Sequence, residues 1–504
     1  MKMNRVVGPV VLTSALISGA FAGTDAIYGE DNRREVFEAT AAQQLLAKST
    51  AAMVSQKNIS ELPNKSHIKQ LAQRSLREWF EEALNGSSTT QGPKLMSNVD
   101  QDHAMAGISF CPGTKFVNQP NPAMCSGFLI APDLIATAGH CVELENFCEE
   151  YRWVFDFKLD KATKRAGLSV ADENIYKCKK VVSNSLNEMI GLDYALIQLD
   201  RAVTGRTPLK IRTDAQVLNA QELVIIGNPM GLPTKVADGA KVIKNNHPFF
   251  FKANLDSFQG NSGSAVFNSQ TGVVEGILVR GEEDYVPNKE LMCFAENICQ
   301  GDKCRGEDVS RILSIPEVSL HEPLIKAVTT GNLELLDKVL EIDSWIDFRT
   351  VDGQSALIKA SAVAQNAAMK KLIERGADVN LKDANGNTSL HVLSLILNET
   401  NADALLTLID AKANLEERNA KTETALLAAA TKLNLESAKI LIKYGVDKNA
   451  ITKSGENAIA PFAKKGNTQA IKALFDMGVE IESVLKIKTL DVNVRKFLKS
   501  LKRN

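Results

Sequence analysis

The sequence predicts a multidomain protein in which a region of short β-strands is followed by an all-α repeat array. Its 504 residues exceed the size at which one hydrophobic core keeps growing, so two to four domains are expected. All eight cysteines lie between Cys111 and Cys304, and the chain repeats itself with a nearly constant period from residue 321 onward. These observations indicate a domain boundary between the last cysteine and the first repeat.

The composition indicates folded, soluble domains. Hydrophobic residues make up 44% of the chain and the formal net charge is -1 at pH 7, whereas a nucleic-acid-binding protein normally carries a basic excess. We therefore expect no nucleic-acid partner. Aromatic residues contribute only 6%, which fits helical repeats rich in alanine and leucine.

Residues 1–22 have the order of features that is typical of a secretory signal peptide. A basic start with Lys2 and Arg5 precedes an apolar run from Val6 to Ala20 and a small-residue cleavage site that ends at Ala22. A retained membrane anchor is the alternative, but the run falls short of the ~20 residues that a membrane span needs. We therefore expect a secreted or periplasmic protein with no membrane span after signal removal.

The cysteines favour disulfides in an oxidising compartment, because an even number of them follows the signal-like segment. The chain has no C-x-x-C pair and no cysteine–histidine cluster at zinc spacing, so metal binding is the weaker interpretation. We expect neither a metal ion nor another cofactor.

Residues 103–312 have the pattern of an all-β domain. Short apolar runs such as ELVIIG and VVEGILVRG are separated by glycine, proline, asparagine and aspartate, the usual residues of turns between strands. The preceding residues 23–102 contain one exception, a periodic charged stretch from Ser66 to Leu84 that predicts an amphipathic helix. This segment either begins the β domain and carries a helical insertion, or forms a removable propeptide; both alternatives stay open.

Five repeat units are expected over residues 321–484, after a linker at residues 313–320. A turn-and-helix landmark recurs at spacings of 33, 33, 36 and 33 residues. The landmark begins at Pro323, Ala356, Ser389, Ala425 and Ala458. A second landmark, the glycine of a GADVN-like sequence, recurs at Gly376, Gly445 and Gly478.

This pattern resembles the ankyrin repeat, with T-A-L-H near the start of a unit and G-A-D-V-N near its end. Each unit would hold two short amphipathic helices, which become stable by stacking on their neighbours to bury one elongated core. The glycine would end the second helix in a left-handed turn. Residues 485–504 predict a basic capping helix; a solvated cap is expected, and an anionic partner is the alternative.

Ser262, between two glycines in the stretch GNSGS, is a candidate nucleophile. A serine hydroxyl attacks a carbonyl only when a base removes its proton. Of the six histidines, His140 is favoured because it follows the strand-like run LIATAG. Asp193, at the start of the strand-like DYALIQL, is the candidate carboxylate that would orient the imidazole and stabilise its cation.

These three stretches, in the order His, Asp, Ser, resemble the trypsin-like serine proteases of the chymotrypsin fold. TAGHC matches the family's histidine motif, DYALIQL its aspartate motif and GNSGS its G-D-S-G-G motif. The resemblance covers roughly residues 27–312 and implies an all-β double barrel for the protease domain. The fold class expected is thus a double-barrel protease domain followed by an all-α ankyrin solenoid.

The resemblance also implies a disulfide between Cys125 and Cys141, which flank the histidine loop. A loop at residues 227–240 resembles a family loop that shapes the substrate cleft, outside the chemistry itself. The pairing of the remaining cysteines stays open: Cys111, Cys148, Cys178, Cys293, Cys299 and Cys304.

The roles follow from the resemblance. Ser262 would attack the scissile carbonyl, His140 would serve as general base and then acid, and Asp193 would hold the histidine tautomer. The backbone N–H groups of Gly260 and Ser262 would form the oxyanion hole. The expected function is a secreted serine endopeptidase acting on protein or peptide substrates, with an ankyrin array that binds a protein partner. The alternative is a catalytically silent or latent protease fold that acts mainly as a binding module.

Asn261 differs from the aspartate that pairs with a new N-terminal amine in pancreatic-type relatives. An uncharged amide cannot hold a buried ammonium in that way, and GNSGS is similar instead to bacterial glutamyl-endopeptidase-like enzymes. Asp256 lies where trypsin binds basic side chains, which favours basic residues at the cleaved position; Arg280 could neutralise it, and a purely structural Asp256 is the alternative. The residues expected around the specificity pocket are Asp256, Leu278, Arg280 and Gly281.

Overall fold

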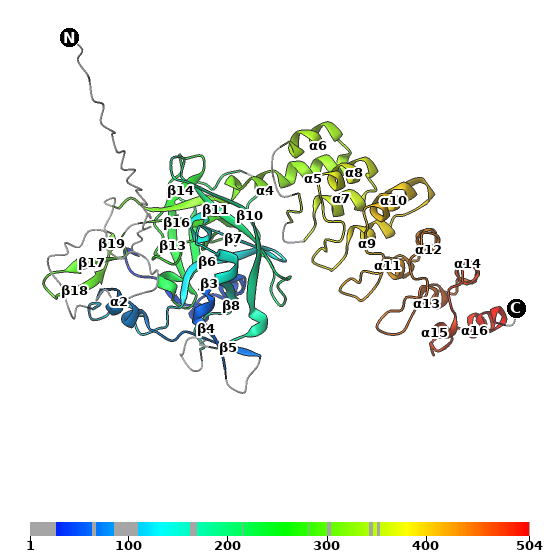
Figure 1. Ribbon diagram of the computed structural model, residues 1–504, viewed down its shortest axis with the longest axis horizontal. Helices are drawn as coiled ribbons and strands as arrows, with labels where there is room; N and C mark the ends of the chain where they lie inside the picture. The colour runs from blue at the N-terminus through cyan, green and yellow to red at the C-terminus, as the bar shows by residue number, and fades with distance from the viewer. Residues whose placement is uncertain are drawn as a thin grey trace, which may run out of the picture.

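The molecule consists of a β-rich N-terminal unit and a helical C-terminal array that extends away from it (Figure 1). The predicted signal peptide, residues 1–22, lies outside the described residues. In the described part of the chain, no helix is both long and apolar enough to span a bilayer. The computed structural model describes residues 27–62, 67–84, 109–161, 169–213, 215–281, 283–299, 304–341, 346–349 and 353–502.

The first barrel is a closed sheet of six strands in the order β10-β11-β7-β6-β3-β8. All neighbours are antiparallel, and the pairing of β10 with β8 closes the ring. Its core is built from alternate inward-facing residues of these strands, as expected for a small barrel whose interior is filled by side chains. The strands are β3 (Thr50–Ser55), β6 (Ala123–Ala131), β7 (Leu134–Thr137), β8 (Tyr151–Phe155), β10 (Ile175–Asn187) and β11 (Leu192–Leu199).

The second barrel has the strand order β12-β15-β16-β20-β14-β13 and is closed by the pairing of β13 with β12. A short strand, β2 (Arg34–Glu35), adds to its edge beside β13. The double-barrel fold is therefore confirmed. The strands are β12 (Glu222–Gly227), β13 (Lys235–Lys244), β14 (Phe250–Ala253), β15 (Ala265–Asn268), β16 (Val274–Arg280) and β20 (Glu307–Arg311).

The described part of residues 23–102 is built into both barrels. Strand β3 lies between β6 and β8, so removing it would open the first barrel and expose two strand edges. The segment also contains β1 (Ile27–Tyr28), which pairs with β19 (Ile298–Cys299), and helix α1 (Ala41–Ala47). These pairings support its assignment as the start of the protease domain.

The helix predicted from Ser66 to Leu84 is wrong in its first half. Residues Ile68–Leu71 form β5, which pairs with β4 (Ile59–Glu61) on one side and β9 (Ser169–Ala171) on the other. Helix α2 begins only at Leu76 and ends at Leu84. Backbone pairing with β4, shortly before it, and with the distant β9 outweighs the local helical periodicity, because the three-stranded sheet satisfies the backbone groups of β5.

A third, smaller core lies beside the second barrel and covers the segment before Ser262. Helix α2 packs against the hairpin of β17 (Tyr285–Asn288) and β18 (Cys293–Glu296), with Phe80 close to the ring of Phe110. The buried members of this α2 core are Ile27, Leu76, Trp79, Phe80, Phe110, Val117, Met230, Leu232, Phe258, Tyr285 and Phe294.

All eight cysteines form disulfides. The implied pair Cys125–Cys141 is present. The other three bridges, whose pairing the sequence leaves open, are Cys111–Cys293, Cys148–Cys178 and Cys299–Cys304.

Helix pairs follow in the C-terminal region. They share one elongated core, and Gly376, Gly445 and Gly478 adopt the predicted left-handed conformation. Helix α15 (Glu482–Leu485) and the basic α16 (Val492–Leu501) cap this core; α15 buries Val484, and α16 buries Val494 and Leu498. The pairs are α5 (His321–Thr330) and α6 (Leu333–Leu340), α7 (Ala356–Ala362) and α8 (Asn366–Glu374), α9 (Ser389–Ser394) and α10 (Ala402–Asp410), α11 (Ala425–Thr431) and α12 (Leu435–Lys443), and α13 (Ile459–Lys464) and α14 (Thr468–Asp476).

Residues 313–320, the expected linker, are folded and packed. They contain the end of a 3-10 turn and helix α4 (Pro316–Ser319). Ile315 and Val318 are buried in the same hydrophobic cluster as the barrel strands, and Phe348 from the first repeat joins that cluster. The array is thus attached to the protease unit through a hydrophobic junction.

Candidate active site

His140 and Asp193 are brought together by two neighbouring strands. Strand β7 ends at Thr137, just before His140, and its partner β11 begins at Leu192, just before Asp193. His140 Nδ1 lies 2.9 Å from Asp193 Oδ2. The other carboxylate oxygen accepts backbone N–H groups from Gly139 at 2.6 Å and from His140 at 3.2 Å.

The burial of the two side chains differs. Only 2% of the Asp193 side chain is exposed, whereas 35% of the His140 side chain is exposed. A buried carboxylate needs donors to replace water, and the imidazole and two backbone N–H groups supply them. The imidazole is therefore fixed from one side and open on the other.

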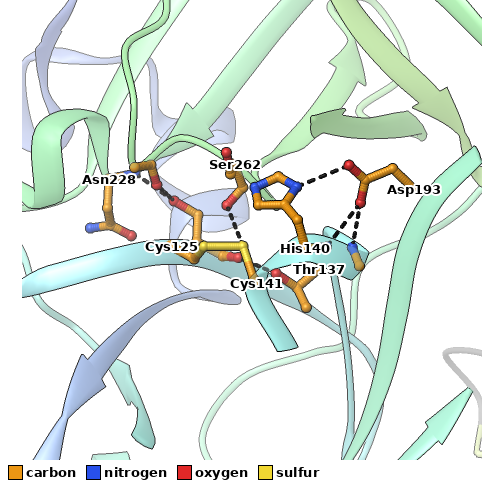
Figure 2. Close-up of a disulfide and its surroundings, with 10 residues drawn as sticks. Cys125, Thr137, His140, Cys141, Asp193, Asn228 and Ser262 are labelled. Atoms are coloured by element: carbon orange, nitrogen blue, oxygen red, sulfur yellow. Dashed lines mark hydrogen bonds and ion pairs between the residues drawn. A yellow bond between two sulfur atoms is a disulfide. The ribbon is translucent and has the colours of Figure 1, made fainter. Parts of the chain in front are cut away.

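Ser262 lies on the open side of the imidazole. Figure 2 shows the ring of His140 between Asp193 and Ser262, with its second nitrogen toward the serine. Among the hydrogen bonds of the described residues, none joins the Ser262 hydroxyl to His140. In enzymes without bound substrate such a bond is often long and tightens on binding.

Two backbone N–H groups next to Ser262 have no acceptor in the described part of the chain: those of Gly260 and of Ser262 itself. The carbonyl oxygens of the two peptide units that carry these N–H groups accept hydrogen bonds. The carbonyl of Gln259 accepts the N–H of Met230, and the carbonyl of Asn261 accepts the N–H of Ser264 at 2.8 Å. Because C=O and N–H point in opposite directions across a planar trans peptide, both free N–H groups point away from these contacts.

Gly260 requires the absence of a side chain for two reasons. Its φ is +89°, a conformation that L side chains rarely adopt. A Cβ there would also lie 2.7 Å from the backbone nitrogen of Gly231 and 2.8 Å from the carbonyl oxygen of Asn228. The 227–240 loop, expected to shape the cleft only, therefore also supports the backbone before Ser262.

Asn261 is buried and neutral, and its hydrogen bonds within the described part of the chain are local. Its side-chain oxygen accepts the hydroxyl hydrogen of Ser264 at 3.2 Å. Asn261 thus contributes a neutral hydrogen bond to this turn.

The disulfide between Cys125 and Cys141 lies directly beside these residues (Figure 2). It ties β6 to the turn that carries His140, and Cys141 Sγ lies 3.8 Å from the carbonyl oxygen of Ser262. Both sulfurs and a nitrogen of His140 lie within 4.8 Å of one another. Because the sulfurs are oxidised, they cannot serve as thiolate metal ligands.

Asp256 anchors the N-terminal segment. Its Oδ1 accepts the backbone N–H of Tyr28 at 2.7 Å, and its Oδ2 accepts that of Asn32 at 3.1 Å. Burial raises the pKa of Asp256 to about 6, and the two backbone donors lower it only in part. This geometry matches the structural alternative considered for Asp256.

The other residues expected around the pocket are not gathered at Asp256. Leu278 is buried in the core of the second barrel. Arg280 does not reach Asp256: its guanidinium pairs with Asp308 at 3.5 Å and donates to the carbonyl of Gly191 at 3.2 Å. The carbonyl of Gly281 accepts a hydrogen bond from Arg305.

Sequence reasoning missed a buried ionic group on the other side of this segment. Arg33 forms ion pairs with Asp31 at 2.8 Å and Glu296 at 2.9 Å, and its guanidinium lies 3.8 Å from the ring centroid of Phe258. Phe258 in turn lies four residues before Ser262. The DNRRE stretch was visible in the sequence, but nothing local shows that it packs against residues more than 200 positions away.

Comparisons with known proteins agree with this architecture. Residues 125–277 match the family model described as "Trypsin-like peptidase domain". The C-terminal region is similar to a putative ankyrin repeat protein of Rickettsia bellii, with 36% identity over 109 residues, covering 20% of this chain and 64% of that protein. It is also similar to human ankyrin repeat and SOCS box protein 11, with 32% identity over 128 residues, covering 25% of this chain and 38% of that protein.

The chain spans less than two thirds of the length of each of these curated relatives. Fold and comparisons together define a protein that combines a peptidase fold with a repeat array. Specifically, the chain carries a trypsin-like peptidase domain followed by ankyrin repeats.

Proposed function

We propose that the protein is a secreted serine endopeptidase that uses His140, Asp193 and Ser262, and that its ankyrin array binds a protein partner. One observation supports this function most strongly. The imidazole of His140 is fixed by a buried carboxylate on one side and faces Ser262 on the other, while two N–H groups with no acceptor among the described residues lie next to the serine.

In the proposed acylation step, Ser262 Oγ attacks the carbonyl carbon of the substrate and its proton passes to His140 Nε2. The Nδ1–H of His140 stays hydrogen-bonded to Asp193, which stabilises the imidazolium. The negative oxygen that forms is stabilised by the N–H groups of Gly260 and Ser262. His140 then gives the proton to the leaving amine.

In deacylation, His140 removes a proton from water, and the resulting hydroxide attacks the acyl-Ser262 ester. The oxyanion forms at the same two N–H groups, and His140 returns the proton to Ser262 Oγ. The 35% exposure of the His140 side chain gives water and substrate access to the imidazole.

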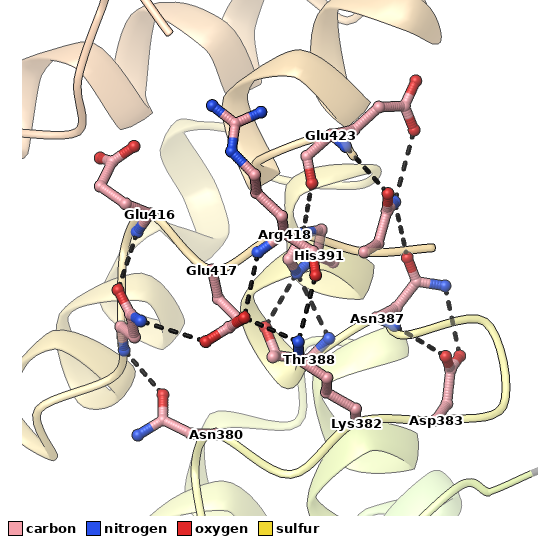
Figure 3. Close-up of polar contacts among 12 residues, drawn as sticks. Asn380, Lys382, Asp383, Asn387, Thr388, His391, Glu416, Glu417, Arg418 and Glu423 are labelled. Atoms are coloured by element: carbon pink, nitrogen blue, oxygen red, sulfur yellow. Dashed lines mark hydrogen bonds and ion pairs between the residues drawn. The ribbon is translucent and has the colours of Figure 1, made fainter. Parts of the chain in front are cut away.

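The ankyrin array offers a polar face for a protein partner. Figure 3 shows polar contacts among residues from successive inter-repeat loops. Asn419 donates to Asn387 at 3.0 Å, and Asn387 donates to Asp383 at 3.3 Å. A hollow of about 330 Å³ lies beside them and is lined in part by His391 and Glu423. Such rows of fixed amides and carboxylates suit the backbone and polar side chains of a protein substrate, inhibitor or envelope partner.

A second candidate is a silent or latent protease fold whose main activity is binding through the array. The observation that favours it is the missing hydrogen bond between Ser262 and His140. The two candidates differ in the reactivity of the serine.

The test is labelling of the purified full-length protein by a fluorophosphonate probe. We expect the wild type to be labelled and Ser262→Ala to be unlabelled, because the probe reacts only with an activated serine. Ser269→Ala, at an exposed serine after β15, serves as the matched control and should retain labelling. A folded wild type that is not labelled would favour the binding module. Cleavage-site profiling on a peptide library would then identify the preferred residue.

A further inference from the structure

We propose that Ser126 is a positioning residue for the oxyanion hole; this inference rests on the proposed function. Ser126 lies in β6, directly after Cys125, and is completely buried. Neither its chemistry nor its position in the sequence suggests a role in the reaction. Its contacts do.

Ser126 binds the carbonyl groups of the same two residues whose N–H groups face the substrate. Its hydroxyl donates to the carbonyl oxygen of Gly260 at 2.9 Å. Its backbone N–H donates to the carbonyl oxygen of Ser262 at 2.8 Å. Its own carbonyl accepts the hydroxyl hydrogen of Thr137 at 2.7 Å, which fixes β6 against β7.

The Ser126 hydroxyl also holds the loop behind Gly260. It accepts the backbone N–H of Asn228 at 2.9 Å. Two residues later in the same loop, Met230 donates its N–H to the carbonyl of Gln259. One hydroxyl therefore joins the two segments that set the orientation of the peptide carrying the Gly260 N–H.

The peptide unit before Gly260 needs this support. Glycine at φ +89° has no side chain to resist rotation, and it populates positive and negative φ about equally well. Without the hydroxyl, the Gly260 carbonyl and the Asn228 N–H would both be buried without partners, and buried backbone groups without partners are rare in native proteins. Rotation about the φ and ψ bonds of Gly260, by which its carbonyl finds a new partner, also turns the preceding peptide and moves the Gly260 N–H away from the substrate.

The experiment compares acylation by p-nitrophenyl acetate in the wild type, Ser126→Ala and a control. Because loss of one oxyanion donor in a related protease costs roughly 10²–10³ in rate, we expect the acylation rate constant of Ser126→Ala to fall at least about tenfold. The dissociation constant for the ester should change by less than about threefold, since the lost contact acts on the transition state. The pH midpoint of acylation should stay unchanged, because His140 and Asp193 keep their contacts.

Ser310→Ala is the matched control. Ser310 is about as buried as Ser126, and its hydroxyl has no hydrogen-bond partner among the residues that the structure describes, so this variant reports the loss of a buried hydroxyl alone. If Ser126→Ala does not fold, Ser126→Gly replaces it, since the smaller residue leaves room for a water molecule. Thermal unfolding of each variant establishes that it is folded.

The outcomes separate the inference from the function. Acylation of a folded Ser126 variant at the rate of Ser310→Ala would overturn the inference while the serine protease function stands. A loss that appears as weaker ester binding or a shifted pH midpoint would also overturn it, because it indicates general disturbance of the site. A wild type that neither acylates nor reacts with the fluorophosphonate probe would overturn the proposed function itself.

Discussion

The residues next to the proposed triad are small because backbone atoms approach them closely. Gly139 is the clearest example: a Cβ atom there would collide with the carbonyl oxygen of Ser185 on β10. Its N–H also donates to Asp193 at 2.6 Å. The TAGHC motif thus encodes a steric requirement, and any larger residue at this position would displace His140 from its carboxylate.

The raised pKa of Asp256 predicts that the stability of the fold depends on pH. Its pKa is about 6 in the folded protein because burial disfavours the charge, against an ordinary value of 3.8. A carboxyl with a raised folded pKa stabilises the fold fully below the unfolded pKa, and this contribution is lost as pH rises through the folded pKa. We expect the wild type to lose about 2 kcal/mol of stability between pH 4 and pH 7 relative to Asp256→Asn.

The measurement is the difference in unfolding free energy between wild type and Asp256→Asn at both pH values. Using the difference removes the titration of all other groups. Asparagine retains an acceptor for one of the two backbone donors, Tyr28 and Asn32, so the variant should fold. A difference that grows in favour of the wild type toward pH 7 would show that the pKa is lowered in the folded state.

The residues of the proposed triad were predictable, whereas their supports were not. His140, Asp193 and Ser262 stand in motifs whose residue types and order carry the information. Asp256 also stands in a motif-like stretch, but its partners Tyr28 and Asn32 lie 228 and 224 positions away. A contact made by backbone N–H groups leaves no residue-type signal, because almost every residue has one.

At the scale of elements, prediction succeeded where the pattern and the packing agree. The repeat helices were predictable because two landmarks fix their period and each helix buries its apolar stripe on a neighbour. Residues Ile68–Leu71 were predicted as helix and form β5, because the deciding partners are β4 and β9. Strand β9 lies about 100 positions along the chain, outside any local window.

Helix α2 stabilises the segment before Ser262 through the α2 core. Phe80 is fully buried, its ring centroid lies 4.2 Å from that of Phe110, and Tyr285 links these rings to Phe258 at 5.2 Å. Truncating a buried phenylalanine removes hydrophobic contacts and leaves a cavity, so we expect Phe80→Ala to cost about 3–5 kcal/mol of stability. Chemical denaturation followed by tryptophan fluorescence measures this loss.

Leu45→Ala is the control for Phe80→Ala, because Leu45 on α1 is 63% exposed and its truncation should change stability by less than about 0.5 kcal/mol. Equal effects of the two variants would contradict a supporting role for the α2 core. That result would mean that the core closes around the cavity at little cost.

For the whole molecule, the junction decides whether the array is a fixed extension of the peptidase domain. Arg349, in the first repeat, is buried and forms an ion pair with Asp133 in the turn between β6 and β7. It also donates to the carbonyl of Lys382 at 2.9 Å, and Gln198 on β11 donates to Asp133 at 3.1 Å. Strands β7 and β11 lead to His140 and Asp193, so the junction and the candidate active site share the same two strands.

Removing Arg349 should loosen this junction. Breaking one partner of a buried ion pair leaves the other charge uncompensated and typically costs 3–5 kcal/mol, so we expect Arg349→Ala to destabilise the docked arrangement by about this amount. Limited proteolysis should then cut near residues 313–320, and thermal unfolding should separate into two transitions. Lys338→Ala is the control, because its pair with Glu334 is exposed and such pairs contribute less than about 1 kcal/mol. Retention of a single transition and of protease resistance in Arg349→Ala would show that the buried cluster around Ile315, Val318 and Phe348 fixes the array without the ion pair.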